Sequence, residues 1–163
     1  MTGFEYAAAG LLIQEGFVKE GVELVEAIRD RYDGKKRNPY AEIECGSSYA
    51  RSMASFALPA VLSGFRFDMT QNRIGFSPVV EIADKPFRCF WAVQNAWGTV
   101  EIGKEQIILS VLRGALPLGS YILPKARDVQ QITVDGAEIR FAADGDLVQF
   151  HEVHSIRDRL VIC

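Results

Sequence analysis

The stretch QQITVDGAEIRFAADGDLVQFHEV, from Gln130 to Val153, decides the fold class of the second half of the chain. Apolar and polar residues alternate along it, which is the period of half-buried β-strands. Asp135-Gly136 lies between two alternating runs, and an Asp-Gly pair in that position is a strong signal for a tight hairpin. Asp144-Gly145 marks a second candidate hairpin. The stretch therefore predicts antiparallel β-structure.

The strand-like pattern extends over residues 74–163, whereas the chain before about residue 66 has a helical pattern. The β-rich part is marked by runs of β-branched and aromatic residues, namely RIGFSPVVEI, FRCFWAVQNAWGTVEI, QIILSVLRG and DRLVIC. A length of 163 residues fits a single domain. We therefore expect an α+β fold, with a helical part over about 1–66 and an antiparallel β region over about 74–163.

The helical part contains three predicted helices. FEYAAAGLLIQEG (Phe4–Gly16) is rich in Ala and Leu, and Gly16 is expected to end that helix in the left-handed conformation. In the next segment, FVKEGVELVEAIRDRYDG, apolar residues recur at helical spacing opposite charged residues. These two segments predict a helical hairpin. A third helix, YARSMASFALPAVLSG (Tyr49–Gly64), is expected to kink at Pro59.

The first predicted helix lacks a polar side. Residues 6–13 read YAAAGLLI, and a helix that is apolar all round is usually buried all round. One interpretation is that it packs against more of a larger fold or against another chain. The other is that the sheet and the third helix cover it.

Composition excludes several classes of partner and compartment. The net charge of −3 gives no electrostatic reason to expect nucleic acid, and no apolar run approaches the roughly 20 residues that span a bilayer. The N-terminus does not resemble a signal peptide. Cys45, Cys89 and Cys163 are odd in number and far apart, which indicates free thiols in a reducing compartment. We therefore expect a cytoplasmic protein without a membrane span.

Polar chemistry gathers in NPYAEIECGSSYARSM, from Asn38 to Met53. In an extended loop Glu42 and Glu44 point to the same side, and Arg51 follows in the first turn of a helix. Carboxylates accept and a guanidinium donates, so together they can hold adjacent sugar hydroxyls. Tyr49 offers an aromatic ring for an apolar sugar face. The alternative interpretation is an exposed loop with a structural Glu–Arg ion pair.

Several motifs of the first 68 residues resemble glycoside hydrolase family 116, which contains bacterial β-glucosidases and the non-lysosomal, bile-acid-type glucosylceramidase. The most specific are RDRYDG, RNP, EIECG, YARSMAS and LSGFRFD, in that order and spacing. They resemble the C-terminal end of the family's catalytic domain, and the similarity continues through IGFSP and FWAVQNAWGTVEI.

The resemblance implies that the helices are the last ones of an (α/α)6 solenoid, which would explain the apolar first helix. It also implies that Glu42 and Arg51 bind glucose hydroxyls in the −1 subsite. The family's catalytic nucleophile and acid/base lie upstream of this region, and nothing in the chain matches their motifs. No catalytic residue is therefore assigned.

Three other features of the sequence could carry metal, sugar or thiol chemistry. His151 and His154 have the spacing of a zinc-binding pair on a helix, but they lie in a strand-like run, where such positions face opposite ways. No metal or cofactor is predicted. Trp91 and Trp97 are candidates for a sugar platform, although residues of this kind more often belong to a sheet core. Cys45 is assigned a packing role.

The function expected from these observations is a C-terminal module of a β-glucosidase- or glucosylceramidase-like hydrolase. It would contribute Glu42, Glu44, Tyr49 and Arg51 to binding a glucose-like sugar, without catalysis of its own. One alternative is a stand-alone carbohydrate-binding or interaction module that self-associates as a homo-oligomer. Another is one half of a split hydrolase, completed by a second chain that carries the catalytic carboxylates.

Overall fold

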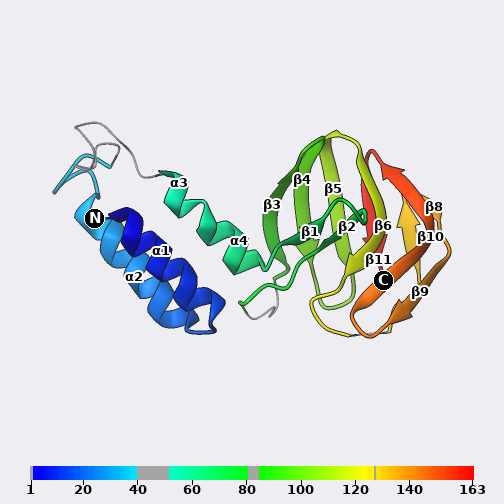
Figure 1. Cartoon of the computed structure of the whole chain (residues 1–163), viewed down its shortest axis with the longest axis horizontal. Helices are drawn as coiled ribbons and strands as arrows, with labels where there is room; N and C mark the ends of the chain where they lie inside the picture. Colours follow the sequence, from blue (N-terminus) through cyan, green and yellow to red (C-terminus); the bar gives the residue numbers. More distant parts are fainter. Residues whose placement is uncertain (1, 40–51, 81–84, 127) are drawn as a thin grey trace. The chain divides into compact units, whose positions relative to one another are not determined.

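The computed structural model describes residues 2–39, 52–80, 85–126 and 128–163. The chain divides into two compact units, Met1–Leu62 and Ser63–Cys163. Apart from the last residue of α4, the helices belong to the first unit, and the second unit consists of two β-sheets (Figure 1). The predicted α+β class is therefore confirmed.

The first unit begins with a helical hairpin of α1 (Thr2–Gln14) and α2 (Val18–Arg31). Gly16 has φ of 90°, and the backbone N–H of Phe17 donates to the carbonyl of Leu12 at 2.8 Å. Only glycine adopts such a φ without strain, so Gly16 ends α1 in the left-handed conformation, as predicted.

Small residues let the two helices approach closely. A Cβ atom on Gly21 would lie 2.5 Å from Cγ1 of Ile13, so a larger residue would push α2 away from α1. Arg31 at the end of α2 donates to Glu5 in the first turn of α1. The core of this unit is apolar and consists of Tyr6, Ala9, Ile13, Ile28 and Leu58.

The predicted third helix is interrupted at Phe56. The structure has two short helices, α3 (Ser52–Ser55) and α4 (Ala57–Ser63), in place of one kinked helix. In a continuous helix the N–H of residue 59 would bond to the carbonyl of residue 55, and Pro59 has no N–H to donate. The effect of Pro59 is therefore larger than the predicted kink.

The second unit contains two sheets. One has the strand order β1-β2-β6-β10-β9 and the other β3-β4-β5-β11-β7-β8. Neighbouring strands pair antiparallel except β2 and β6, which are parallel. The strands are β1 (Arg66–Asp68), β2 (Arg73–Gly75), β3 (Phe87–Val93), β4 (Ala96–Ile102), β5 (Ile107–Gly114), β6 (Leu116–Ile122), β7 (Ile132–Val134), β8 (Ala137–Glu138), β9 (Phe141–Asp144), β10 (Leu147–Ile156) and β11 (Arg159–Ile162).

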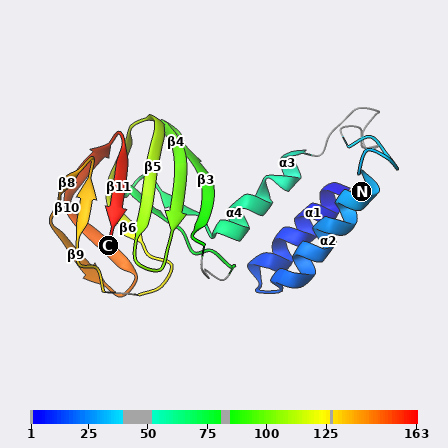
Figure 2. The same cartoon turned by 180° about the vertical axis from the view of Figure 1, so that it is seen from behind.

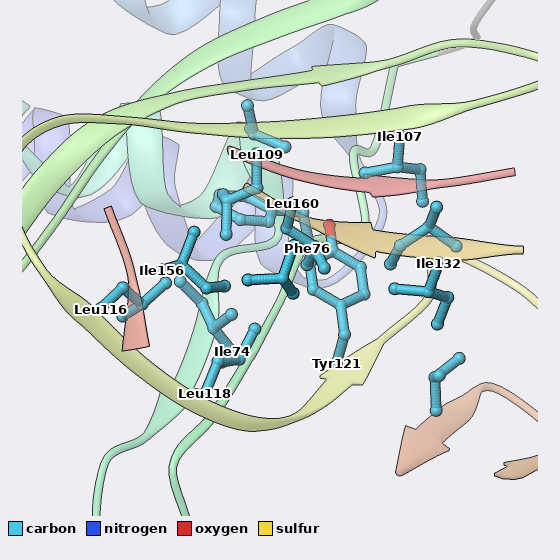
Figure 3. Packing of buried hydrophobic residues seen from close by; sticks show 14 of the residues in the cluster. Ile74, Phe76, Ile107, Leu109, Leu116, Leu118, Tyr121, Ile132, Ile156 and Leu160 are labelled. Atoms are coloured by element: carbon cyan, nitrogen blue, oxygen red, sulfur yellow. The ribbon is translucent and has the colours of Figure 1, made fainter. Parts of the chain in front are cut away.

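Both sheets contribute to one apolar core, because alternate residues of each strand point to the same side. Figure 3 shows Tyr121 of β6 and Phe76, which directly follows β2, beside Leu109 and Leu160 from the other sheet. All four side chains are at most 1% exposed. The β unit therefore has a continuous interior of its own, which fixes the face on which each strand residue lies.

Both predicted hairpins are present. β7 and β8 are joined by Asp135 and Gly136, whose φ values of 49° and 86° are those of a tight hairpin turn. β9 and β10 are joined after Asp144 through Gly145, with φ of 61°. Among the helices that the structure describes, none is long and apolar enough to cross a membrane.

Asp135 ties its hairpin to the turn before β11. Its carboxylate accepts the backbone N–H groups of Arg157, Asp158 and Arg159, at 2.9–3.0 Å. Desolvation raises the pKa of the Asp135 carboxyl, but the N–H groups of Asp158, Arg157 and Arg159 outweigh it and hold that pKa below its usual value. The ionised carboxylate therefore stabilises the folded state.

Replacing Asp135 by Asn should remove the charge while keeping a residue that tolerates the left-handed turn. We expect the free energy of unfolding at neutral pH to fall by roughly 1 kcal/mol, which is less than the full strength of a hydrogen bond to a charged group because solvent screens this exposed carboxylate. Because the folded-state pKa is the lower one, the contribution is complete above the unfolded-state pKa of about 4. It is lost as pH falls through the folded-state pKa. Urea unfolding at a series of pH values measures the difference.

The matched control is Asp144→Asn, which changes an exposed carboxylate in the neighbouring hairpin. Its difference in unfolding free energy from the wild type should be small. A gap between wild type and Asp135→Asn that stays constant down to pH values well below the unfolded-state pKa would contradict the account of this turn.

Candidate functional site

The four predicted sugar-binding residues, Glu42, Glu44, Tyr49 and Arg51, lie outside the described residues. Cys45 does as well. Their roles stay predictions, and the nearest described positions are Pro39 and Ser52, which opens α3.

Hydrogen bonds order the chain just before that motif. Oδ1 of Asp33 accepts the backbone N–H groups of Lys35 and Lys36, at 2.9 and 2.8 Å. These two N–H groups, with that of Lys36 the stronger influence, hold the pKa of the Asp33 carboxyl below its usual value. Nζ of Lys36 donates to Asp30 at 2.6 Å, and this bond raises the pKa of Lys36. The end of α2 and the following turn are therefore held by local charges.

One side of α1 carries an exposed row of apolar residues. Tyr6, Ala9 and Ile13 face the core of the helical unit. Phe4, Ala7, Ala8 and Leu11 are exposed, and Phe4 and Leu11 retain 70% and 59% of their accessible surface. Their spacing of three and four residues places them on one stripe of the helix. We call these four residues the α1 face.

The two tryptophans lie on opposite faces of their sheet. Trp91 in β3 is 1% exposed and belongs to the core, whereas Trp97 in β4 is 41% exposed. The Trp91–Trp97 platform considered from the sequence is therefore not formed. Phe90, 57% exposed, accompanies Trp97, and the two ring centroids are 6.1 Å apart with a tilt of 43°.

Polar groups surround this aromatic pair on the outer side of β3, β4 and β5, which lie side by side in Figures 1 and 2. Thr99 lies opposite Phe90 in the strand register, and Nε of Arg88 donates to Oε2 of Glu101 at 2.7 Å. We call Arg88, Phe90, Trp97, Thr99 and Glu101 the aromatic face. A shallow depression of about 440 Å³ is lined by Arg88, Cys89, Phe90, Thr99, Val100 and Glu101.

A β-bulge accompanies the outward placement of Trp97. The register between β4 and β5 shifts between Trp97 and Gly98, so that Leu112 is the extra residue on β5. A Cβ atom on Gly98 would lie 1.8 Å from the carbonyl oxygen of Ser110 and 3.1 Å from the ring of Trp91. Only glycine fits between the two, so Gly98 allows Trp91 to fill the core beneath the outer face.

In the described part of the chain, no cluster of three or more His, Cys, Asp and Glu residues is placed to hold a metal ion. The two histidines are therefore not joined there by further ligands. His151 is exposed on β10, and the ring of His154 meets Phe150 edge-on at 6.1 Å. Cys89 and Cys163 are free thiols.

The sequence interpretation missed Phe90, although a signal for it was present. In FRCFWAV the alternation of a strand allows only one of Phe90 and Trp91 to face the core, so the other must face outward. Phe90 is that residue, and its ring completes the aromatic face.

Neither a protein-family model nor a curated protein sequence matches the chain.

The placement of the tryptophans predicts different fluorescence for two single-tryptophan variants. Trp97→Phe retains only the buried Trp91 and should emit at short wavelength, with little quenching by acrylamide. Trp91→Phe retains only the exposed Trp97 and should emit at longer wavelength with strong quenching. Stern–Volmer constants measure the difference, and equal constants in two folded variants would contradict the described register of β3 and β4.

Proposed function

We propose that the chain is a C-terminal module of a β-glucosidase- or glucosylceramidase-like glycoside hydrolase. In this role it contributes sugar-binding residues to a site whose catalytic carboxylates lie elsewhere. The observation that carries the proposal is the α1 face, an apolar helix surface left exposed next to a formed helical core. The resemblance of the surrounding sequence to the end of a helical solenoid is consistent with that surface.

The physical argument starts from the cost of exposure. Contiguous apolar surface on a helix is stabilised when another element covers it, and large exposed patches usually mark interfaces. Phe4 and Leu11 are the two large side chains of the α1 face, and Ala7 and Ala8 between them let a partner helix approach closely. A neighbouring helix of a larger solenoid is the partner that this shape suits.

The sugar-binding part of the proposal rests on Glu42 and Arg51, with Glu44 and Tyr49 beside them. Arginine and carboxylate side chains make charge-assisted hydrogen bonds, which suit a ligand whose hydroxyls both donate and accept. Retaining hydrolysis also needs a nucleophile and an acid on either side of the scissile bond, about 5–5.5 Å apart. The proposal assigns that pair to residues outside this chain.

The purified chain is expected to bind a glucose-like iminosugar without hydrolysing an aryl β-glucoside. Calorimetry should show saturable binding that is lost in Glu42→Gln and in Arg51→Ala, because each change removes a charged hydrogen-bonding group. Glu26→Gln, at an exposed carboxylate of α2, is the control and should keep iminosugar binding. Enzyme-like turnover of the glucoside by the chain alone would contradict the proposal, as would iminosugar binding unaffected by both loop variants.

The alternative, a self-associating module, is favoured by the symmetry of the α1 face. Along the chain, the side chains of the α1 face are large, small, small and large (Phe4, Ala7, Ala8 and Leu11). In an antiparallel pair of α1 helices, Phe4 of one copy would lie against Leu11 of the other, which is the isologous contact of a two-fold dimer. A split hydrolase would instead place a helix of a second chain on the same face.

Sedimentation velocity at increasing protein concentration separates these cases. If the α1 face pairs with itself, the wild type should form dimers, and Leu11→Glu should be monomeric because a carboxylate would be buried at the contact. Val153→Glu, at an apolar residue of β10 that is 55% exposed against 59% for Leu11, is the control and should dimerise like the wild type. A wild type that stays monomeric at every concentration would contradict self-association.

A further inference from the structure

We propose that the aromatic face binds a neutral oligosaccharide. Trp97 and Phe90 would stack on the C–H faces of sugar rings, and the polar residues beside them would hydrogen-bond to the hydroxyls. This site belongs to the β unit. It depends neither on Glu42 and Arg51 nor on the family resemblance.

The two rings provide the apolar part of the site. They are tilted by 43° at a centroid distance of 6.1 Å, so they do not cover one another as a closely stacked pair would. Single exposed apolar residues are common, but two adjacent exposed aromatic side chains with polar neighbours are typical of binding surfaces. A sugar ring has an apolar C–H face that can lie against an aromatic ring.

Polar side chains provide the matching hydrogen-bonding groups. The Thr99 hydroxyl, which both donates and accepts, lies opposite Phe90, and Ser110 of β5 lies opposite Thr99. Nε of Arg88 already donates to Oε2 of Glu101 at 2.7 Å, so this pair holds a hydrogen-bond donor and an acceptor side by side. Neighbouring sugar hydroxyls present the same alternation of donors and acceptors.

Charge complementarity favours a neutral ligand over a polyanion. Glu101 compensates the charge of Arg88. Arg159 of β11 lies opposite Ser110, and its charge is compensated by Asp158, whose Oδ2 accepts from Nε of Arg159 at 3.1 Å. The chain as a whole carries a net charge of −3. Arg113 of β5, exposed opposite Trp97, adds one basic side chain to this surface. Nucleic acids and acidic polysaccharides are bound through several such side chains.

The framework under the rings is rigid. Phe90 and Trp97 lie on paired strands, and β4 is hydrogen-bonded on both sides, to β3 and β5. Gly98 allows Trp91 to pack directly beneath β4. Binding groups on strands lose less conformational freedom when a ligand binds than the same groups on loops.

A protein partner fits these observations less well. A stable protein interface buries about 800 Å² on each partner and has an apolar centre. Here charged and hydroxyl groups lie directly beside the two rings. Among the described strands β3 lies at the edge of its sheet. Addition of a peptide strand there would use backbone groups at the edge, whereas the rings project from the sheet surface.

The test is titration of the full chain with four neutral hexasaccharides (cellohexaose, maltohexaose, mannohexaose and xylohexaose), followed by calorimetry and by acrylamide quenching of tryptophan. At least one should bind saturably and shield Trp97 from quenching. Trp97→Ala and Phe90→Ala should each weaken that binding by about tenfold, the equivalent of losing one aromatic contact. Trp97→Phe should retain most of the affinity, because a flat ring remains.

The matched control is Phe67→Ala, which removes a ring of similar exposure, 61% against 57% for Phe90, from the other sheet. It should bind like the wild type. The iminosugar titration of the loop variants is a separate measurement, so failure of this site and failure of the proposed loop site are distinguishable.

Three results would overturn the inference. One is the absence of saturable binding with any of the four hexasaccharides at millimolar concentration. Another is binding that persists unchanged in folded Trp97→Ala and Phe90→Ala variants. The third is a loss of self-association in those variants without any effect on sugar binding, which would identify the surface as a contact between copies.

Discussion

The shared core between the two sheets is the constraint on which the described β unit depends. The longer strands send alternate residues into one interior, so the face of each of their side chains is fixed once a single residue is placed. Trp91 shows how strict this is, because its ring lies beside Gly98, where no Cβ atom fits. With Trp91 inside, Phe90 must lie outside. The aromatic face is therefore a direct consequence of how the core is filled.

In the helical unit, buried residues recur at the spacing of a helix, and the surface that remains exposed on α1 is apolar. α1 buries Tyr6, Ala9 and Ile13, but residues on its other side remain apolar and exposed. A single α2 cannot cover a helix that is apolar all round. The exposed side of α1 suits another helix, whereas the aromatic face mixes rings with hydrogen-bonding groups and suits a small polar ligand. The two units thus carry surfaces of different chemistry, and our two proposals rest on them separately.

Sequence patterns predicted the α+β class, the end of α1 at Gly16 and both hairpins, because each depends on local chemistry. They did not decide between a sugar platform and a core role for Trp91 and Trp97, because pairing between strands decides it. A turn at Gln94–Asn95 places Trp97 opposite Ala92, so Trp91 belongs to the core and Trp97 does not. The break at Phe56 was also underestimated, since the pattern of the third helix does not show how far Pro59 disrupts it. Glu42, Glu44, Tyr49 and Arg51 were chosen from a motif, and their arrangement lies outside the described residues.

The most direct test of this account is a ¹H–¹⁵N NMR titration of the full chain with a neutral hexasaccharide, observing the two indole N–H signals. Trp91 and Trp97 are the only tryptophans, so the two signals report on the core and on the aromatic face. The account predicts that the Trp97 signal shifts saturably, together with backbone amides of β3 and β4, while the Trp91 signal stays nearly unchanged. Saturable shifts confined to other strands, or none at millimolar sugar, would contradict it.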